Sequence, residues 1–446
     1  MFRKKSSLIL FVLIWFCRPL MAQDEDALPT VDNETDSVVK GHKGEMRVMK
    51  NYHLGDGLNL ISKNAQIQVT QSIQPFYGVS TPDDLSSVNS EYRIRRARLN
   101  FAGFLYTKIF FRIILNLADE YQSTTTGSRT FNSVVQDAMV EYRPTPDHRI
   151  NFGIRADYSD VREIRIEGEQ LGFINRSIVS DAFDAVFDYG IRYRGQFRLS
   201  NGAVFKPYLS FTTGDGLASL QKNFTGFKYG IRLDYLPFGT FSKGGEFFMD
   251  DLIRERTPKL VFGGVFSFND GISSAKGTNG GKYIYGDSTQ KIVRPTLTKI
   301  GVDYMFKYRG FYSLGDFVIT HSSVPHNVYG EFSSSGTFTP YTGQTPEQIK
   351  NTVMSRINLG SGLNLQAGYM ISNYSLAARY SYLQQDEQSA DFATVNKMYS
   401  VVLTRYFQGH NLKINLEAGY QQFNKAITTE EHNGTLYLQT MLTVQF

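Results

Sequence analysis

Polar and apolar residues alternate strictly along much of the chain. In residues 411–421, Leu412 and Leu416 fall on one face, whereas Lys413 and Glu417 fall on the other. A period of two predicts β-strands that have one apolar and one polar face. The pattern predicts sixteen such strands, at residues 66–77, 92–105, 108–118, 133–142, 148–155, 186–198, 203–212, 225–236, 259–268, 298–308, 311–319, 362–371, 373–382, 395–406, 411–422 and 434–446.

The connections between these strands alternate in length. Short turns occur at Tyr106-Thr107, 199–202, Arg309-Gly310 and Ser372-Asn373. Long loops are predicted at residues 78–90, 119–132, 156–185, 269–297 and 320–361. Short turns on one side and long loops on the other are typical of outer-membrane barrels. Residues 237–258 are an exception, because this long connection falls on the short-turn side.

The apolar faces decide between a soluble β-sandwich and a membrane barrel. Every predicted strand carries Tyr, Phe or Leu on its apolar parity, and the strands have nearly equal lengths. Strands of about 9–11 residues span a bilayer, and Tyr and Phe form girdles at its edges. The pattern therefore predicts an all-β fold, a 16-stranded antiparallel transmembrane β-barrel over residues 64–446, with short periplasmic turns and long extracellular loops. Outer-membrane lipid is its expected surroundings.

The first residues have the form of a secretory signal peptide. Basic Arg3 precedes the apolar stretch Leu8 to Phe16, and Ala22 is a small residue at the expected cleavage site. Nine apolar residues are too short to span a bilayer. We therefore expect a signal peptide over residues 1–22 and the outer membrane of a Gram-negative bacterium as the destination. Residues 23–63 are expected to form an acidic flexible tail and a lead-in to the barrel.

Removal of this peptide changes the composition. The single Cys and the single Trp leave with it, and the net charge falls from +5 to +1. Residues 23–39 contain six acids and no base, so the remaining chain carries 43 basic and 36 acidic residues, a net charge of +7. A chain with one Cys has neither a disulfide framework nor a Cys-rich zinc site.

The strand parity directs much of this positive charge inward. Strand 186–198 places Arg192, Arg194 and Arg198 on its polar face together with Asp188. Strand 92–105 points Arg96 and Arg98 inward and Arg93 and Arg95 outward, unless a bulge swaps those roles. The other inward candidates for guiding anions are Arg112, Lys228 and Arg232.

Columns of arginine offer fork-shaped donors to successive anions, and a narrow pore concentrates the ions that its charge attracts. Porin interiors are also charged for structural reasons, because arginine often pairs with an acid across the wall. Inward acids such as Asp188 and Asp234 would then neutralise part of the column. The sequence pattern is compatible with both interpretations.

Several segments resemble the phosphate-selective porin O and P family. They are RIRRARLNFAGFLYTKIFFRI (93–113), QDAMVEYRPTPDHRINFGIR (136–155), LGFINRSIVSDAF (171–183) and YSVVLTRYF (399–407). The resemblance implies a sixteen-stranded homotrimeric porin, a third loop folded into the pore, and an arginine ladder that carries small anions such as phosphate.

The resemblance also assigns roles to individual residues. By motif position, Arg95, Arg96, Arg192 and Arg194 are the ladder candidates. The third loop is 156–185, and its constriction candidates are Arg155, Arg162, Arg165 and Arg176. The chain departs from the family where Gly153 begins the stretch Gly-Ile-Arg-Ala-Asp-Tyr-Ser, which lacks the Lys and Pro-Phe of the family. Acids also enter this loop at Asp157, Asp160, Glu163, Glu167 and Glu169.

The motifs of other chemistries are missing from the sequence. There is no HExxH zinc motif and no GxSxG nucleophile elbow. The stretch 277–282 lacks the spacing of a phosphate loop. We therefore expect no enzyme, no metal, no cofactor and no nucleic-acid partner. The alternatives to an anion-preferring porin are a general or sugar-type porin, and a receptor or structural barrel that binds a partner through loops 269–297 and 320–361.

Overall fold

The computed structural model describes residues 47–48, 52–118, 134–184, 187–217, 226–278, 280–426 and 431–446. The predicted signal peptide, most of the acidic tail and the predicted loop 119–132 lie outside the described residues.

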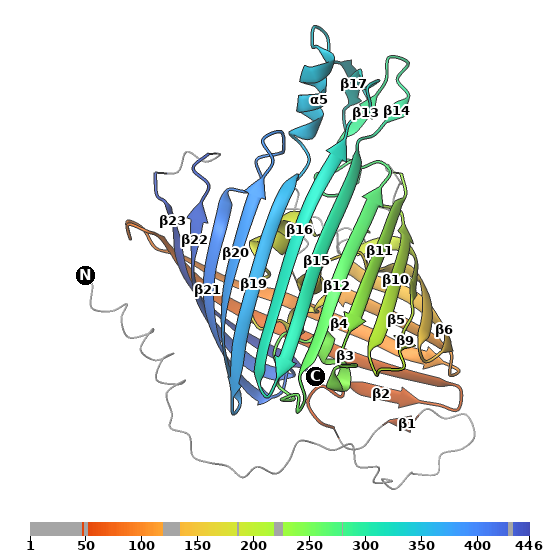
Figure 1. Ribbon diagram of the computed structural model, residues 1–446, viewed down its shortest axis with the longest axis vertical. Helices are drawn as coiled ribbons and strands as arrows, with labels where there is room; N and C mark the ends of the chain where they lie inside the picture. The colour runs from red at the N-terminus through yellow and green to blue at the C-terminus, as the bar shows by residue number, and fades with distance from the viewer. Residues whose placement is uncertain are drawn as a thin grey trace. The chain divides into compact units, whose positions relative to one another are not determined.

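Sixteen antiparallel strands close into a barrel (Figure 1). The last strand pairs with the first over Gln445↔Ser72 to Thr435↔Pro82, which closes the ring. Each predicted segment overlaps one barrel strand, so the predicted fold class is confirmed. The strands are β3 (Ala65–Pro82), β4 (Asn89–Leu105), β5 (Ile109–Asn116), β6 (Val135–Thr145), β7 (His148–Ala156), β8 (Phe187–Arg194), β10 (Val204–Thr212), β11 (Lys228–Leu236), β12 (Lys259–Asn269), β15 (Thr296–Tyr308), β16 (Phe311–Ser323), β19 (Gly360–Ile371), β20 (Tyr374–Gln385), β21 (Val395–Gln408), β22 (Leu412–Phe423) and β23 (Gly434–Gln445).

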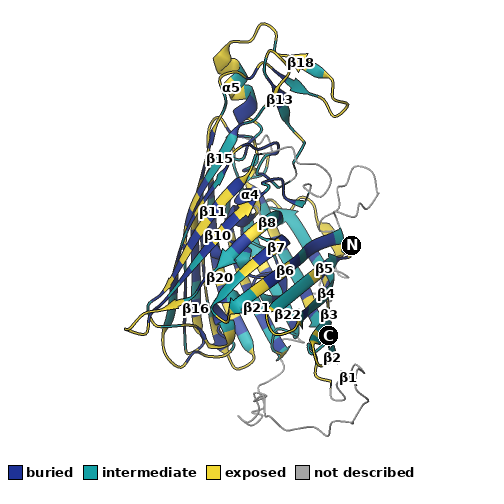
Figure 2. Ribbon diagram, turned by 90° about the vertical axis from the view of Figure 1, so that its right-hand side faces the viewer, coloured by how far each residue is buried: buried dark blue, intermediate teal, exposed yellow. Residues whose placement is uncertain are grey.

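The alternating sequence pattern becomes two faces of the wall. In β11, Ile231 is 45% exposed on the outside, whereas its neighbour Arg232 is 0% exposed on the inside. Figure 2 shows exposed and buried residues alternating along the strands. A closed barrel pairs the backbone groups of all its strands, so an apolar outer face can contact lipid without an open sheet edge.

Further short strands adjoin the barrel. β1 (Arg47–Val48) pairs with β2 (Leu58–Ile61), and β2 pairs with the start of β3. The predicted lead-in therefore contains a strand. β9 (Phe197–Arg198) continues the line of β8 after an interruption at Gly195, so the sixth predicted strand is broken near its end.

A bulge in β4 corrects one predicted orientation. The pairing between β3 and β4 shifts between Gln74 and Pro75, which leaves Arg95 as the extra residue. Arg93 was predicted to face outward, but it pairs with the buried Phe76, and its guanidinium lies 5.0 Å from that ring. The bulge therefore turns Arg93 inward, because one extra residue reverses the parity beyond it.

Two long external loops fold together into a small subdomain. Its four-stranded sheet contains β13 (Ile284–Gly286), β14 (Ile292–Val293), β17 (Gly330–Phe332) and β18 (Phe338–Pro340). Helix α5 (Pro346–Met354) begins with a capping box formed by Thr345 and Gln348. The subdomain also has an apolar cluster of its own, which includes Tyr285, Val328, Val353 and Ile357. The predicted loops 269–297 and 320–361 are thus partly folded structure.

A partly exposed ion pair contributes to this subdomain. Arg356 donates a hydrogen bond to the carboxylate of Glu331 in β17, and the hydroxyl of Tyr341 donates to the same carboxylate. The hydrogen bond from Arg356 is the main cause that lowers the pKa of Glu331. The pair therefore favours the folded subdomain while Glu331 is ionised.

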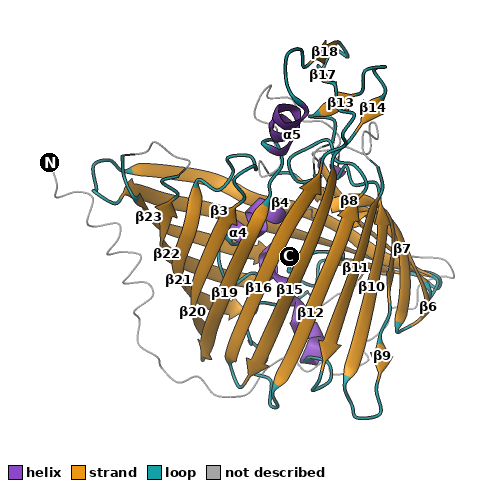
Figure 3. Cartoon of the chain, turned by 45° about the horizontal axis from the view of Figure 1, so that its top comes forward, coloured by secondary structure: helices purple, strands orange, loops and turns teal. Residues whose placement is uncertain are grey.

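Two segments fill part of the barrel interior. The inward loop, residues 157–184, contains α3 (Arg162–Arg165), the 3-10 turn η2 (Gly168–Gln170) and α4 (Ile178–Phe183). The insert, residues 237–258, contains the 3-10 turn η4 (Ser242–Phe247). Figure 3 shows helical turns inside the ring of strands. Among the described residues, no helix is long and apolar enough to cross a membrane.

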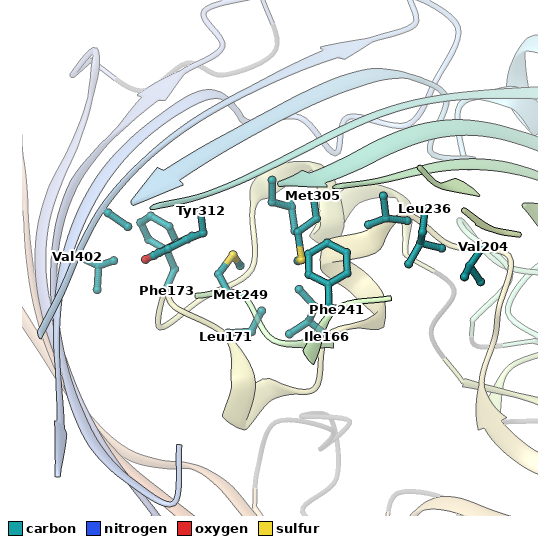
Figure 4. Close-up of a cluster of buried hydrophobic side chains, with 13 residues drawn as sticks. Ile166, Leu171, Phe173, Val204, Leu236, Phe241, Met249, Met305, Tyr312 and Val402 are labelled. Carbon is teal, nitrogen blue, oxygen red and sulfur yellow. The ribbon is translucent and has the colours of Figure 1, made fainter. Parts of the chain in front are cut away.

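Apolar contacts hold both segments against the wall. Ile166 and Phe173 of the inward loop and Met249 of the insert share one buried cluster with Met305 and Tyr312 of the wall (Figure 4). A second cluster joins the inward loop to the strands β16 and β20. The inner face of this part of the wall therefore serves as a packing surface and not as the side of an open pore.

Candidate functional site in the barrel lumen

The inward loop is organised around the carboxylate of Glu163. Its Oε2 accepts hydrogen bonds from the backbone N–H and the hydroxyl of Ser177, and from the hydroxyl of Ser180. Ser177 also caps α4, since its hydroxyl accepts a hydrogen bond from the backbone N–H of Ser180 at 3.1 Å. The amide of Gln366 in β19 donates to Oε1 of Glu163. These bonds fix the loop internally and attach it to the wall.

Each acid in the first half of the inward loop pairs with a basic residue of the wall. The pairs are Asp157 with Lys228 at 2.8 Å, Asp160 with Lys299, Glu163 with Arg379 at 3.8 Å, Glu167 with Arg112 at 2.7 Å and Glu169 with Arg98 at 3.0 Å. Five oppositely charged pairs therefore position the loop across the lumen. The acids of the inward loop thus neutralise inward-facing bases of the wall. From the sequence pattern alone, these bases would be interpreted as a column of unpaired charges.

Two bases of the inward loop, Arg162 and Arg165, pair with acids of the wall. Arg162 donates to Asp234 at 2.9 Å and to Asp303 at 3.0 Å. Arg232 donates to both carboxylate oxygens of Asp303, at 2.7 and 2.8 Å. These four charged groups are buried together, and a buried charge persists only where partners compensate it. Arg165 donates to Asp234 at 3.3 Å.

Two of the ladder candidates are completely covered. Arg96 donates to Oε1 of Gln74 at 2.8 Å and lies under the inward loop, where a Cβ on Gly168 would approach its Nε to 2.4 Å. Arg192 donates to three backbone carbonyls, those of Gly153, Arg155 and Asp188. Both guanidiniums are 0% exposed, so neither can touch a solute in this arrangement.

A cavity of about 430 Å³ lies in the lumen between the inward loop and strands β3 to β8. The arginines that line it are Arg98, Arg112, Arg155, Arg165, Arg176 and Arg194. The acids that line it are Asp137, Asp157, Glu167 and Glu169. Six positive and four negative side chains give the lining a net charge of +2.

These six arginines are among the thirteen predicted site residues. The others lie elsewhere. Arg162, Lys228 and Arg232 are buried in ion pairs, and Arg96 and Arg192 are covered. Arg95 lies at the bulge, and Arg198 pairs with Asp147 at 2.6 Å on the exposed short-turn rim.

Comparison with known proteins agrees with this architecture. Residues 67–161 match the family model described as phosphate-selective porin O and P. The predicted family resemblance is confirmed over these residues. The family match and the barrel fold are those of an outer-membrane protein and support a diffusion channel. No curated protein matches the chain.

Solved porin structures are similar to this chain at low identity. OmpT of Vibrio cholerae, folded in vitro, is 9% identical with a TM-score of 0.48, over 87% of this chain and 99% of that chain. OmpF of Salmonella typhi in complex with daunomycin is 13% identical with a TM-score of 0.49, over 87% and 100%. A mutant of the Rh. blastica porin is 11% identical with a TM-score of 0.43, over 85% and 100%.

One arginine of the barrel was missed in the sequence. Arg143 bonds to Glu141 at 2.7 Å and lies over the rings of Phe104 and Phe110. Arg149 and Arg155 also approach Glu141, each at 3.7 Å. The predicted strand ended at residue 142, three residues before the end of β6 at Thr145. Extending the inward parity by one step would have found Arg143.

The insert was also missed as part of the lumen. Nζ of Lys307 in β15 donates to the carbonyls of Gly245, Phe248 and Asp250, at 2.8, 2.9 and 2.5 Å. The hydroxyl of Tyr406 in β21 donates to the carboxylate of Asp250. The sequence signal was the apolar content of this connection, including Phe241 and Met249, both now buried. A solvated turn has no reason to carry such residues.

The chemistry of the site is electrostatic. Within the part of the chain that the structure describes, no three His, Cys, Asp or Glu residues are grouped to hold a metal ion. The cavity offers guanidinium groups as hydrogen-bond donors beside carboxylates that reduce their net charge. Such a lining can attract and orient an anion and release it again, because guanidinium is weakly hydrated and remains charged at all relevant pH values.

Proposed function

We propose that the protein is a passive outer-membrane porin whose lumen favours small anions, phosphate among them. The single observation that carries the proposal is the cavity lining of six arginines and four acids. Arg194 is the central residue of the argument. It lines the cavity and forms no salt bridge within the described part of the chain, so its charge is available to a solute.

The proposed mechanism uses charge and confinement. An anion that enters the lumen meets Arg98 and Arg112 beside the inward loop, and then Arg155 and Arg194 on the wall. Fixed positive charge in a narrow, low-dielectric passage raises the local anion concentration. Fork-shaped donors suit phosphate oxygens. The loop acids keep each interaction weak enough for the ion to leave, which passage requires.

Reversal potentials in a KCl gradient test this proposal directly. The protein is reconstituted in a planar bilayer, and added phosphate serves as a competing anion. We expect chloride preference that decreases in R194Q. R198Q is the matched control, because Arg198 lies on the rim outside the cavity. Cation preference of the wild type, or equal reversal potentials in R194Q and the wild type, would refute the proposal.

Three further features belong to the proposal. Residues 1–22 are a signal peptide cleaved after Ala22, the membrane is that of a Gram-negative bacterium, and the barrel assembles as a homotrimer. The basic-apolar-small pattern of the N-terminus supports the first, the barrel fold supports the second, and the family resemblance supports the third. N-terminal sequencing of the membrane protein and chemical cross-linking check them.

Two specific observations favour other candidates. The four acids in the cavity lining reduce its charge to a level that also suits a general or sugar-type porin, for which the reversal potential would be near zero. The external subdomain, which has its own apolar cluster, favours a receptor that binds a partner. A barrel that does not conduct would support the receptor.

A further inference from the structure

The insert gives the cavity a second kind of surface. Phe247 and Phe248 line it and are partly exposed to it. The insert is attached to the inner faces of β15 and β21 through Lys307 and Tyr406. Its rings therefore reach the cavity from a different side of the barrel than β4 and β5 do. A connection on the short-turn side thus contributes directly to the solute pathway.

Aromatic rings and guanidiniums meet in this place. The guanidinium of Arg165 lies 4.4 Å from the ring centroid of Tyr208, 5.7 Å from that of Phe247 and 6.0 Å from that of Tyr158. Tyr158 and Phe247 also line the cavity, whereas Arg98, Arg112, Arg155 and Arg194 line it from the strands. The cavity is therefore amphipathic, because aromatic rings and cations share its lining.

We propose that this channel preferentially takes organic anions with a flat apolar body, such as aromatic phosphate esters and carboxylates, and that Phe247 and Phe248 determine this specificity. The inference rests on the proposed anion channel and deepens it. The arginines hold the anionic group of the solute, while the two phenyl rings contact its body. Inorganic phosphate uses the arginines alone.

Such a solute would bind more tightly than inorganic phosphate because two contacts add: the arginines bind its anionic group, and the phenyl rings contact its flat body. Offset or edge-to-face aromatic pairs contribute beyond simple burial, and a flat ring loses little conformational freedom when it binds. Rings that served only to pack the insert would be buried like Phe241 and Met249, which are 4% and 1% exposed. Phe247 and Phe248 instead present part of their surface to the cavity.

Current block compares two probes that share one head group, phenyl phosphate and inorganic phosphate. In bilayers that contain the wild-type protein, we expect phenyl phosphate to block the chloride current at concentrations about tenfold lower than inorganic phosphate. In F247S/F248S, we expect its apparent affinity to fall about three- to tenfold, the size of an aromatic contact, with no change for inorganic phosphate. F238S is the matched control, because Phe238 belongs to the insert but does not line the cavity.

A second variant keeps the test decisive if the serine variant does not assemble. F247L/F248L retains apolar volume and removes only the rings, so it should weaken block by phenyl phosphate alone. An anion-selective wild type that both probes block equally would overturn this inference and leave the proposed function standing. A cation-selective wild type would overturn both. Block by phenyl phosphate that is unchanged in either cavity variant would also refute the role of these rings.

Discussion

The acids of the inward loop set the charge of the cavity, and removing two of them should make the channel more anion-selective. Glu167 pairs with Arg112 at 2.7 Å, and Glu169 pairs with Arg98 at 3.0 Å. The double variant E167Q/E169Q keeps side chains of the same size and removes two negative charges. The net charge of the lining then rises from +2 to +4.

The size of the effect follows from Coulomb's law. A cavity of about 430 Å³ keeps a permeating ion within roughly 10 Å of both carboxylates. One charge at that distance changes the energy of the ion by about 0.4 kcal/mol in water, and by about 0.15 kcal/mol with the screening of 0.1 M salt. Two charges favour an anion and disfavour a cation by about 0.3–0.8 kcal/mol each, which multiplies the anion-to-cation permeability ratio about 3- to 15-fold.

Reversal potentials in a KCl gradient measure this ratio, at 0.1 M and again at 1 M salt. The shift should decrease at 1 M, because the Debye length falls to about 3 Å. The opposite variant R98Q/R112Q lowers the lining charge from +2 to 0 and should shift the potential the other way. A shift of the same sign in both variants would refute the reasoning, since it would show that loosening of the loop, and not charge, controls selectivity.

Three other perturbations test the interior and the external subdomain. D303A removes one of the two buried carboxylates that Arg162 and Arg232 share, so we expect a loss of about 3–5 kcal/mol in the free energy of unfolding by guanidinium in liposomes; an unchanged midpoint would contradict the role of this cluster. K307M removes three hydrogen bonds that hold the insert and should raise single-channel conductance, whereas equal conductance would show that other contacts suffice. E331Q should weaken hydrogen-exchange protection of the subdomain at pH 7. This difference from the wild type should vanish as the pH falls through the lowered pKa of Glu331, because the wild-type carboxyl then also becomes neutral; a difference that persists would rule out the ion pair.

The fold could be predicted from the sequence because a barrel wall is a local pattern. The parity of Lys413 and Glu417 against Leu412 and Leu416 follows from the period of the strand, and both charged residues are indeed buried at 0% exposure. The short turn at Arg309-Gly310 could also be predicted. The structure confirms it, because both residues have the positive φ that a tight hairpin turn requires. The bulge at Arg95 could not be placed from the sequence, because the sequence does not show which residue of a strand remains unpaired with its partner strand.

The pairing inside the barrel could not be predicted in the same way. Parity tells which side chains point inward, but the partners come from distant parts of the chain. Arg162 and Asp303 are 141 residues apart, and Ile174 and Glu417, whose carboxylate accepts the Ile174 N–H, are 243 apart. The path of the inward loop through the lumen determines which of these distant residues come into contact. A list of inward charges therefore fixes the net charge of the interior without telling which charges remain available.

The structure thus gives two different roles to arginines that share one sequence pattern. Arg192 and Arg194 are two residues apart on the same face of β8, and the sequence treats them alike. Three carbonyls surround Arg192, whereas Arg194 lines the cavity. Replacing both at once would mix a structural defect with a change in selectivity. Only the single variants separate the two roles, because a covered guanidinium supports the wall that holds an exposed one in place.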